Sequence, residues 1–160
     1  MAERSILGLA VLLVEDDVDS QEVMTEFLIG LGCEVRVAGS AAEARAHLAS
    51  WLPDVILCDV TLPDEDGFAM VSGLRGDPRT AAVPAIAMTG RSDGAARGRA
   101  TRAGFQKFVT KPFDLFALPA ALTSASSMEN GAPVLATFRQ YELRSSFSAG
   151  NVSVCGCSRS

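Results

Sequence analysis

Polar residues that could do chemistry stand directly after four separate apolar runs of the 160-residue sequence. They are two adjacent acids, Glu15 and Asp16, then a single acid, Asp59, then Thr89, and last Lys111. If the apolar runs are parallel strands of one sheet, these residues meet at the same edge, where open α/β sheets bind ligands. We therefore expect one site that combines carboxylates, a hydroxyl and an ammonium group.

Such a set of side chains is suited to phosphoryl transfer. Two or three carboxylates together do not easily stay ionised without a compensating cation. Mg²⁺ suits them because it accepts one or two carboxylates and keeps several waters, and Mn²⁺ is the alternative metal. Metal, ammonium and hydroxyl around one carboxylate can stabilise the charge on a transferred phosphoryl group. Asp59 would then be the nucleophile and would form an acyl phosphate.

The elements that must position these residues alternate along the chain. Short apolar runs predict five strands, at residues 10–14, 34–38, 55–58, 83–88 and 105–109. Helical spacing predicts a helix after each strand, with apolar residues between 23–31, 41–51 and 68–74, then up to 103, and at 115–122. Connections of this kind build right-handed βαβ units. The expected fold class is therefore α/β, a five-stranded parallel sheet with helices on both faces, whose strand order stays open.

Two of the predicted helices have features that a structure can test. The first has apolar residues at 23, 24, 27, 28 and 31, the spacing of one core-facing stripe, and Gly32 is its expected stop. The last has Asp114 as its cap but contains Pro119. Proline removes an amide donor, so it should shorten or kink this helix unless it lies in the first turn.

Composition and charge exclude several classes of protein. The net charge of −5 argues against a dedicated nucleic-acid binder, because phosphate contacts need a basic face. No apolar run approaches the ~18 residues that a membrane span requires. The N-terminus lacks the small-residue cleavage site of a signal peptide, so we expect a cytoplasmic protein. Cys155 and Cys157 have no cluster of other metal ligands near them, which favours incidental thiols.

Four motifs together resemble the receiver domain of response regulators in two-component systems. They are Leu-Leu-Val-Glu-Asp-Asp at 12–17, Asp-Val-Ile-Leu-Cys-Asp-Val-Thr-Leu-Pro-Asp-Glu-Asp-Gly at 54–67, Ala-Met-Thr-Gly at 87–90 and Lys-Pro-Phe at 111–113. The resemblance spans about residues 9–122 and is greatest to receivers of hybrid histidine kinases or to a stand-alone receiver. It implies the (βα)5 flavodoxin-like receiver fold.

The resemblance also divides the chain. It implies a lead-in at residues 1–8, a receiver domain at 9–123 and a tail at 124–160. Ser, Gly, Asn and Ala are frequent in that tail and charges are few. Its composition favours one short amphipathic helix within residues 132–147, followed by disorder from residue 145 onward.

The resemblance implies a role for each residue of the acidic site. Asp59 matches the phosphoacceptor. Glu15 and Asp16 match the acid pair, with Asp16 binding Mg²⁺ directly and Glu15 through water. The backbone carbonyl of Thr61 matches the third protein ligand of the metal. Thr61 and Arg91 also flank the route of the hydrolytic water, so they are expected to tune the lifetime of the phosphoryl group.

The remaining motif positions match the parts that respond to phosphorylation. Thr89 matches the residue whose hydroxyl turns inward to the phosphoryl group, and Lys111 matches the lysine that pairs with a phosphoryl oxygen. Phe108 matches the aromatic switch that moves with Thr89, although an aromatic residue at a strand end also packs well as plain core. The peptide before Pro112 is expected to be cis, as in the family.

The function implied is that of a phosphoacceptor signalling domain and not of an enzyme. A histidine kinase or histidine phosphotransfer protein would donate the phosphoryl group to Asp59 in a Mg²⁺-dependent step. The only chemistry expected of the chain itself is self-phosphorylation and self-dephosphorylation. The modified domain would switch a surface that binds a downstream protein. We expect no DNA and no membrane among its partners, and a homodimer stays open.

Two other functions fit the same fold class. One is a receiver-like interaction module that no longer accepts phosphate, although the complete set of site residues argues against it. The other is an aspartate-nucleophile phosphatase of the haloacid-dehalogenase kind. Those enzymes carry a second aspartate two residues after the nucleophile, where this chain has Thr61. The partner kinase, the signal and the output are not determined by the sequence.

Overall fold

The structure is a computed structural model that describes residues 6–90, 94–111 and 114–126. Several predictions lie outside these residues: those for Arg91, for the cis peptide before Pro112, for Cys155 and Cys157, and for the tail helix and disorder after residue 126. The division of the chain at residue 123 stays a prediction.

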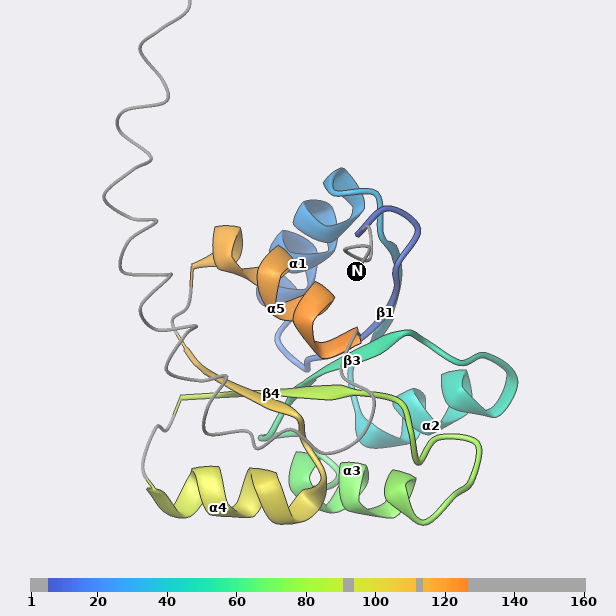
Figure 1. Ribbon diagram of the computed structural model, residues 1–160, viewed down its shortest axis with the longest axis vertical. Coiled ribbons are helices and arrows are strands. Elements are labelled where there is room, and N and C mark those ends of the chain that lie inside the picture. Colours follow the sequence, from blue (N-terminus) through green and yellow to red (C-terminus); the bar gives the residue numbers. More distant parts are fainter. Residues whose placement is uncertain (1–5, 91–93, 112–113, 127–160) are drawn as a thin grey trace, which may run out of the picture.

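Five parallel strands form one sheet in the order β2-β1-β3-β4-β5 (Figure 1). They are β1 (Ala10–Val14), β2 (Glu34–Ala38), β3 (Val55–Asp59), β4 (Ala85–Thr89) and β5 (Lys107–Thr110). This is the flavodoxin-like doubly wound order, which confirms the expected fold class. The chain runs from β1 outward to β2 and then returns past β1 to β3. The order therefore reverses between β1 and β3, and ligands bind such sheets outside the carboxyl ends of the strands at that point.

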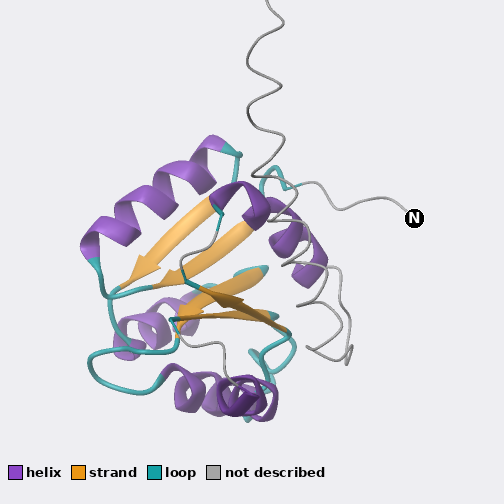
Figure 2. Ribbon diagram, turned by 90° about the vertical axis from the view of Figure 1, so that its left-hand side faces the viewer, coloured by secondary structure: helices purple, strands orange, loops and turns teal. Residues whose placement is uncertain are grey.

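Helices cover both faces of the sheet (Figures 1 and 2). They are α1 (Val18–Gly30), α2 (Ala41–Ser50), α3 (Gly67–Arg75), α4 (Gly94–Ala103) and α5 (Leu118–Ser126). Buried residues of α1 and α5 pack on one face of the sheet, and those of α2, α3 and α4 pack on the other. Successive residues of each central strand alternate between the two cores. This explains why β3 and β4 are buried at every position and appear in the sequence as continuous apolar runs.

The apolar runs in the sequence place the starts of two strands too early. β4 begins at Ala85 and β5 at Lys107, later than the predicted starts at 83 and 105. Val83 and Phe105 are buried, but they lie in the connections that lead into the sheet. Apolar residues that pack beneath a strand look the same in sequence as residues within it.

The first helix confirms one prediction and corrects another. Gly32 has φ +90° directly after the helix, a conformation that glycine adopts at helix ends. Met24 and Leu28 are buried as expected. Val23, predicted to face the core, is 53% exposed. The helix contacts the sheet along one narrow stripe, and position 23 lies about 100° around the axis from position 24.

The predicted last helix is two elements. Asp114 caps a short 3-10 helix, η1 (Leu115–Ala117), and α5 follows at once. Pro119 lies in the first turn of α5, where its missing amide would have had no helical partner. The predicted end at Leu122 is wrong, because the helix continues to Ser126 and buries Ala125.

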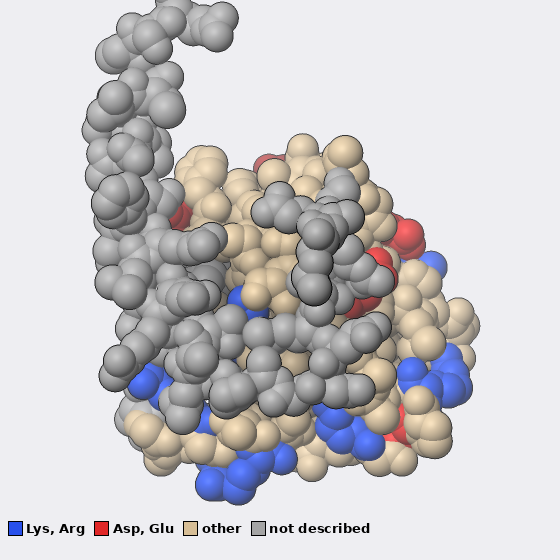
Figure 3. All heavy atoms as spheres, in the orientation of Figure 1, with Lys and Arg blue, Asp and Glu red and all other residues tan. Residues whose placement is uncertain are grey.

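The helices on the two faces differ in charge. The α1 sequence contains three acids and no basic residue, whereas α4 contains Arg97, Arg99 and Arg102 and no acid. In Figure 3, Lys and Arg side chains gather on the side where α3 and α4 lie in Figure 1. No helix in the described part of the chain has the length and hydropathy of a membrane span.

Gly67 allows a close approach that another residue would prevent. A Cβ at this position would lie 2.5 Å from the Asp59 carbonyl oxygen and 2.8 Å from Val60 Cα. Both atoms belong to the backbone, so they cannot move aside cheaply. We expect Gly67→Ala to lower the free energy of unfolding by about 1–3 kcal/mol, the usual cost of overpacking. Urea unfolding followed by circular dichroism measures this loss.

Gly73 in the same helix is the matched control. A Cβ there would make only an ordinary 3.7 Å contact with Arg45 Nη2. Alanine is favoured over glycine in a helix by about 1 kcal/mol, so Gly73→Ala should leave the urea midpoint unchanged or raise it. Equal effects of the two substitutions would contradict the account of Gly67.

Candidate functional site

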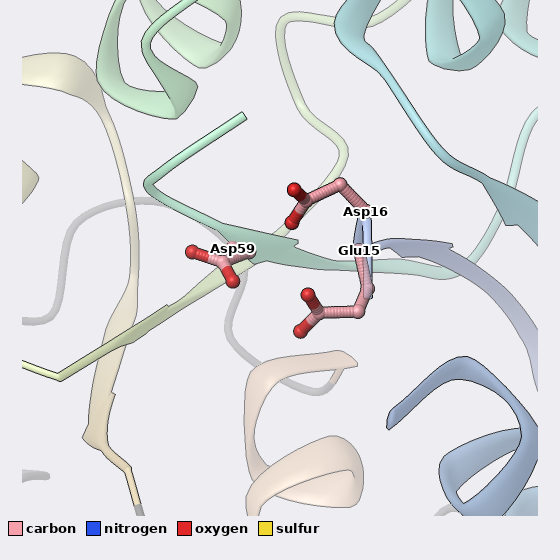
Figure 4. Close-up of side chains that lie close together, drawn as sticks. All are labelled: Glu15, Asp16 and Asp59. Carbon is pink, nitrogen blue, oxygen red and sulfur yellow. The ribbon is translucent and has the colours of Figure 1, made fainter. Parts of the chain in front are cut away.

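The site lies where the strand order reverses, at the neighbouring carboxyl ends of β1 and β3. Glu15 follows β1 directly, and its amide donates to the Ala38 carbonyl and so continues the pairing with β2. Asp59 is the last residue of β3. Figure 4 shows the side chains of Glu15, Asp16 and Asp59 gathered beyond these two strand ends. The predicted meeting of the acids is confirmed.

The three carboxylates are close enough to share one ion. One oxygen from each lies within 4.8 Å of the others. Glu15 is 1% exposed, Asp59 is 9% exposed, and Asp16 is on the surface. The cluster is therefore open to solvent on the side of Asp16 and closed beneath Glu15.

A single ammonium group bridges two of these acids. Lys111 Nζ donates to Glu15 Oε2 at 2.6 Å and to Asp59 Oδ2 at 2.9 Å. Among the described residues, one positive charge thus faces three carboxylates, and their charges sum to an excess of negative charge. Oxygen ligands that carry such an excess fit a hard divalent cation such as Mg²⁺.

Burial and charge change the proton affinity of the groups in this cluster. Burial raises the pKa of Glu15 above its usual 4.5, and the nearby charge of Asp59 adds to the rise, against the bond from Lys111. Burial lowers the pKa of Lys111, but its bonds to Asp59 and Glu15 outweigh this and the net direction is upward. The lysine is therefore charged at neutral pH, whereas the ionised form of Glu15 costs stability.

Backbone amides and one further side chain orient the acids. The Thr61 amide donates to Asp59 Oδ1 at 2.8 Å, and the Asp17 amide donates to Glu15 Oε1 at 3.2 Å. From α1, Gln21 Nε2 donates to the Glu15 carbonyl. Gln21 was not predicted, because a glutamine on a helix has no sequence signal that distinguishes it from a solvated residue.

The other predicted residues divide between the site edge and the core. Thr89 is the last residue of β4 and is 4% exposed, and its carbonyl accepts from the Lys111 amide at 2.6 Å. The ends of β4 and β5 thus reach the same edge as the acids. Phe108 lies within β5, before the carboxyl end of that strand. It is 2% exposed and packs in the core beneath α3 and α4.

One arginine of α4 is about half exposed and nevertheless has specific partners. Arg99 Nη2 donates to Asp66 Oδ2 at 2.6 Å, and its guanidinium carbon lies 4.5 Å from the centre of the Phe68 ring. Asp66 also caps α3 by accepting from the Phe68 amide at 2.7 Å. The segment after Asp59 is therefore connected to α4 as well as to α3.

The sequence matches a known family over most of its length. The family described as response regulator receiver domain matches residues 11–123. An uncharacterized 14.6 kDa protein of Leptolyngbya boryana is 34% identical over 69% of this chain and 85% of its own length. The transcriptional regulatory protein GltR of Pseudomonas aeruginosa is 35% identical over 66% of this chain, which is 44% of GltR. The match thus spans less than half of that longer relative.

Solved structures agree with the fold. A putative response regulator from Chloroflexus aurantiacus superposes with a TM-score of 0.72 at 31% identity, over 76% of this chain and 99% of its own. The receiver domain of sensor histidine kinase PA1611 from Pseudomonas aeruginosa superposes with a TM-score of 0.70 at 29% identity, over 76% and 99% of the two chains. That domain was solved with magnesium coordinated in its active-site cleft.

The cost of the buried acid predicts how stability depends on pH. The folded-state pKa of Glu15 lies above 4.5, so its ionised form costs stability at pH 7, and this cost disappears as the pH falls through that pKa toward 4.5. In metal-free buffer we expect Glu15→Gln to raise the free energy of unfolding at pH 7, because the uncharged amide avoids the cost of a buried carboxylate. The gain should shrink toward zero near pH 4.5, as urea unfolding across that range would measure.

Glu34→Gln is the matched control for this substitution. Glu34 is exposed on the edge strand β2, so its neutralisation should change the free energy of unfolding by less than about 0.5 kcal/mol at any pH. A loss of stability in Glu15→Gln at pH 7 would contradict the assigned cost of that carboxylate.

Proposed function

This chain belongs to the response regulator receiver domain family of two-component signalling, and on that premise we propose that Asp59 accepts a phosphoryl group from phosphohistidine. The observation that carries the proposal is the cluster itself. Three carboxylates lie within 4.8 Å of one another, and Lys111 donates to two of them. An ordinary ion pair combines one acid with one base, whereas here three acids lie beside one lysine among the described residues.

The acids and one carbonyl are the groups that would hold Mg²⁺, with Mn²⁺ as the alternative. Asp16 and Asp59 would bind the ion directly, Glu15 would bind it through water, and the Thr61 carbonyl would supply the third protein ligand. The fit is supported by the excess negative charge and by the all-oxygen donor set. When bound, the ion supplies positive charge that offsets the charge on the transferred group.

The reaction moves one phosphoryl group between two side chains. An oxygen of Asp59 forms a bond to phosphorus, and the bond from phosphorus to the partner's imidazole nitrogen breaks. That nitrogen keeps the electron pair. The Thr61 amide orients the carboxylate through Oδ1, and Lys111 lies beside Oδ2, where it can follow the new charge onto a phosphoryl oxygen. Histidine kinases and histidine phosphotransfer proteins are the class of donor that this chemistry requires.

Phosphorylation would then change the surface through the strand ends. The new group adds roughly −1.5 to −2 charge at pH 7, by analogy with other phosphorylated side chains. The Thr89 hydroxyl turns toward it, and Phe108 moves with Thr89. Because Phe108 packs in the core with residues of α3 and α4, its movement would shift the population of arrangements on that side. A downstream protein would recognise the changed surface.

Other details of the family mechanism are part of the same proposal. Thr61 and Arg91 would tune the lifetime of the acyl phosphate. Pairing of two chains is a further proposal. We favour a receiver over an aspartate-nucleophile phosphatase because Thr61 stands where such an enzyme needs its second aspartate. We also favour it over an interaction module that accepts no phosphate, since the acid pair, Asp59, Thr89 and Lys111 are all present.

Phosphorylation of the natural protein by a small donor tests the proposal. With acetyl phosphate and Mg²⁺ we expect intact mass spectrometry to detect one added phosphoryl group. The adduct should be absent without Mg²⁺ and absent from Asp59→Asn, because an amide is a poor nucleophile and a poor metal ligand.

Asp54→Asn is the control for this experiment. Asp54 lies at the opposite end of the sheet, just before β3, and accepts from the Ala10 amide at 2.8 Å. This variant should be phosphorylated like the natural protein. A stable adduct on Asp59→Asn would sink the assignment of the phosphoacceptor.

The response to phosphorylation can be separated from the transfer. We expect Thr89→Ala to accept phosphate, because the metal ligands and Asp59 remain. We expect it to lose the phosphorylation-induced change in amide hydrogen exchange in α4 and β5. Thr101→Ala, at an exposed position of α4, is the control and should keep that change. If phosphorylated Thr89→Ala showed the full change in amide hydrogen exchange, Thr89 would have no part in the conformational response.

A further inference from the structure

The loop between β3 and α3 is fastened at its base and, separately, at its tip. At the base, Thr61 and Asp66 form an antiparallel bridge, and the Gly67 amide donates to the Val60 carbonyl at 2.9 Å. The tip, which consists of Asp64 and Glu65, reaches away from the sheet to α2. The loop is already closed by the contacts at its base, so closing the loop does not require these two contacts with α2.

Asp64 completes the N-terminus of a helix that is distant in sequence. Its two carboxylate oxygens accept from the Ala41 amide at 3.0 Å and from the Ala42 amide at 2.9 Å. The cap of the helix itself, Ser40, accepts from the Glu43 amide at 3.2 Å. The amides of the first helical turn, which have no partner within the helix, are thus shared between a local cap and the loop. The same two bonds lower the pKa of Asp64, which keeps it charged at neutral pH.

Glu65 makes the second contact with the same helix. Its two oxygens accept from both terminal nitrogens of Arg45, the longer bond being 3.0 Å. This paired geometry fixes direction as well as distance. Both side chains are partly exposed, so the pair alone is weak. Together with Asp64 it attaches the tip to α2 at two successive residues.

The position of this loop matters to the acidic cluster. Thr61 lies in the loop only two residues after Asp59, and its amide donates to Asp59 Oδ1. Any displacement of the loop therefore moves a peptide that contacts the proposed phosphoacceptor. The tip is attached to α2 through Asp64 and Glu65, whereas the base is attached to α3 and α4 through Asp66 and its bridge with Thr61. Loss of the tip contacts would leave the Thr61 peptide held only from the base, and we expect it to be less precisely placed.

We propose that Asp64 and Glu65 are positioning residues of the metal site, which hold the Thr61 peptide beside Asp59 by fastening the loop to α2. This inference rests on the proposed function, because it assigns the Thr61 carbonyl to Mg²⁺. Neither residue touches the ion or the transferred group. Residues that orient metal ligands from outside typically change metal affinity by 10- to 100-fold when they are replaced.

The test uses the full chain and two readouts that do not depend on phosphorylation. Isothermal titration with Mg²⁺ should give an affinity about tenfold weaker for Asp64→Ala than for the natural protein. Hydrogen exchange in metal-free buffer should be faster at residues 60–66 in that variant. Asp64→Asn keeps one acceptor oxygen and should recover part of the affinity. Glu65→Gln leaves the α2 amides satisfied and should weaken binding by about threefold.

Asp54→Ala is the matched control. It removes another bond from a carboxylate to a backbone amide, that to Ala10, at the far end of the sheet. It should keep the natural affinity for Mg²⁺ even if it lowers the unfolding temperature as much as Asp64→Ala does. Natural Mg²⁺ affinity in both Asp64→Ala and Glu65→Gln would overturn the inference, as would equal weakening in Asp54→Ala. A natural protein that binds no Mg²⁺ and accepts no phosphate would overturn the proposed function as well.

Discussion

The contact of one ammonium group with two carboxylates is the interaction on which the rest of the site depends. Lys111 neutralises only part of the charge of Glu15, Asp16 and Asp59, and Glu15 is almost wholly buried. The folded protein thus keeps an arrangement that disfavours the ionised form of one of its own residues. A locally unfavourable charge arrangement is typical of functional sites. An added cation can bind the unbalanced negative charge and relieve the repulsion. The burial of Glu15, to which the charge of Asp59 adds, explains why a metal-free protein should gain stability when Glu15 loses its charge.

The order of the strands is what creates this cluster. β1 and β3 are neighbours although a strand and two helices separate them in sequence, so acids that follow each strand meet. The loop after β3, which begins directly after Asp59, contacts three helices. Asp64 and Glu65 attach it to α2, while Asp66 caps α3 and binds Arg99 of α4. The segment that follows the Asp59 carboxylate is therefore in direct contact with α2, α3 and α4, whose outer surfaces lie outside the site.

Much of the fold and of the site could be predicted from sequence because the signals are local. An apolar run followed by an acid, a threonine or a lysine marks a strand end, and the structure brings Glu15, Asp16, Asp59 and Lys111 together as expected. Features that depend on packing could not be predicted. Val23 has the residue type of a core position but lies off the buried stripe of α1, and α5 outlasts its predicted end because Ala125 meets the core. The bonds of Asp64 were hidden because acids in a loop after proline look like ordinary turn residues until α2 is placed beside them.

Selection of a divalent cation by the excess charge of this one cluster can be measured by a Mg²⁺ titration followed by amide NMR. We expect saturable shifts that concentrate at the ends of β1 and β3, around residues 15–17 and 59–61, with little change at the exposed acids of α1. Shifts spread evenly over the surface acids, or no saturable shift at millimolar Mg²⁺, would contradict this selection. In that case the cluster would be a structural arrangement of Lys111 and its acids and not a metal site.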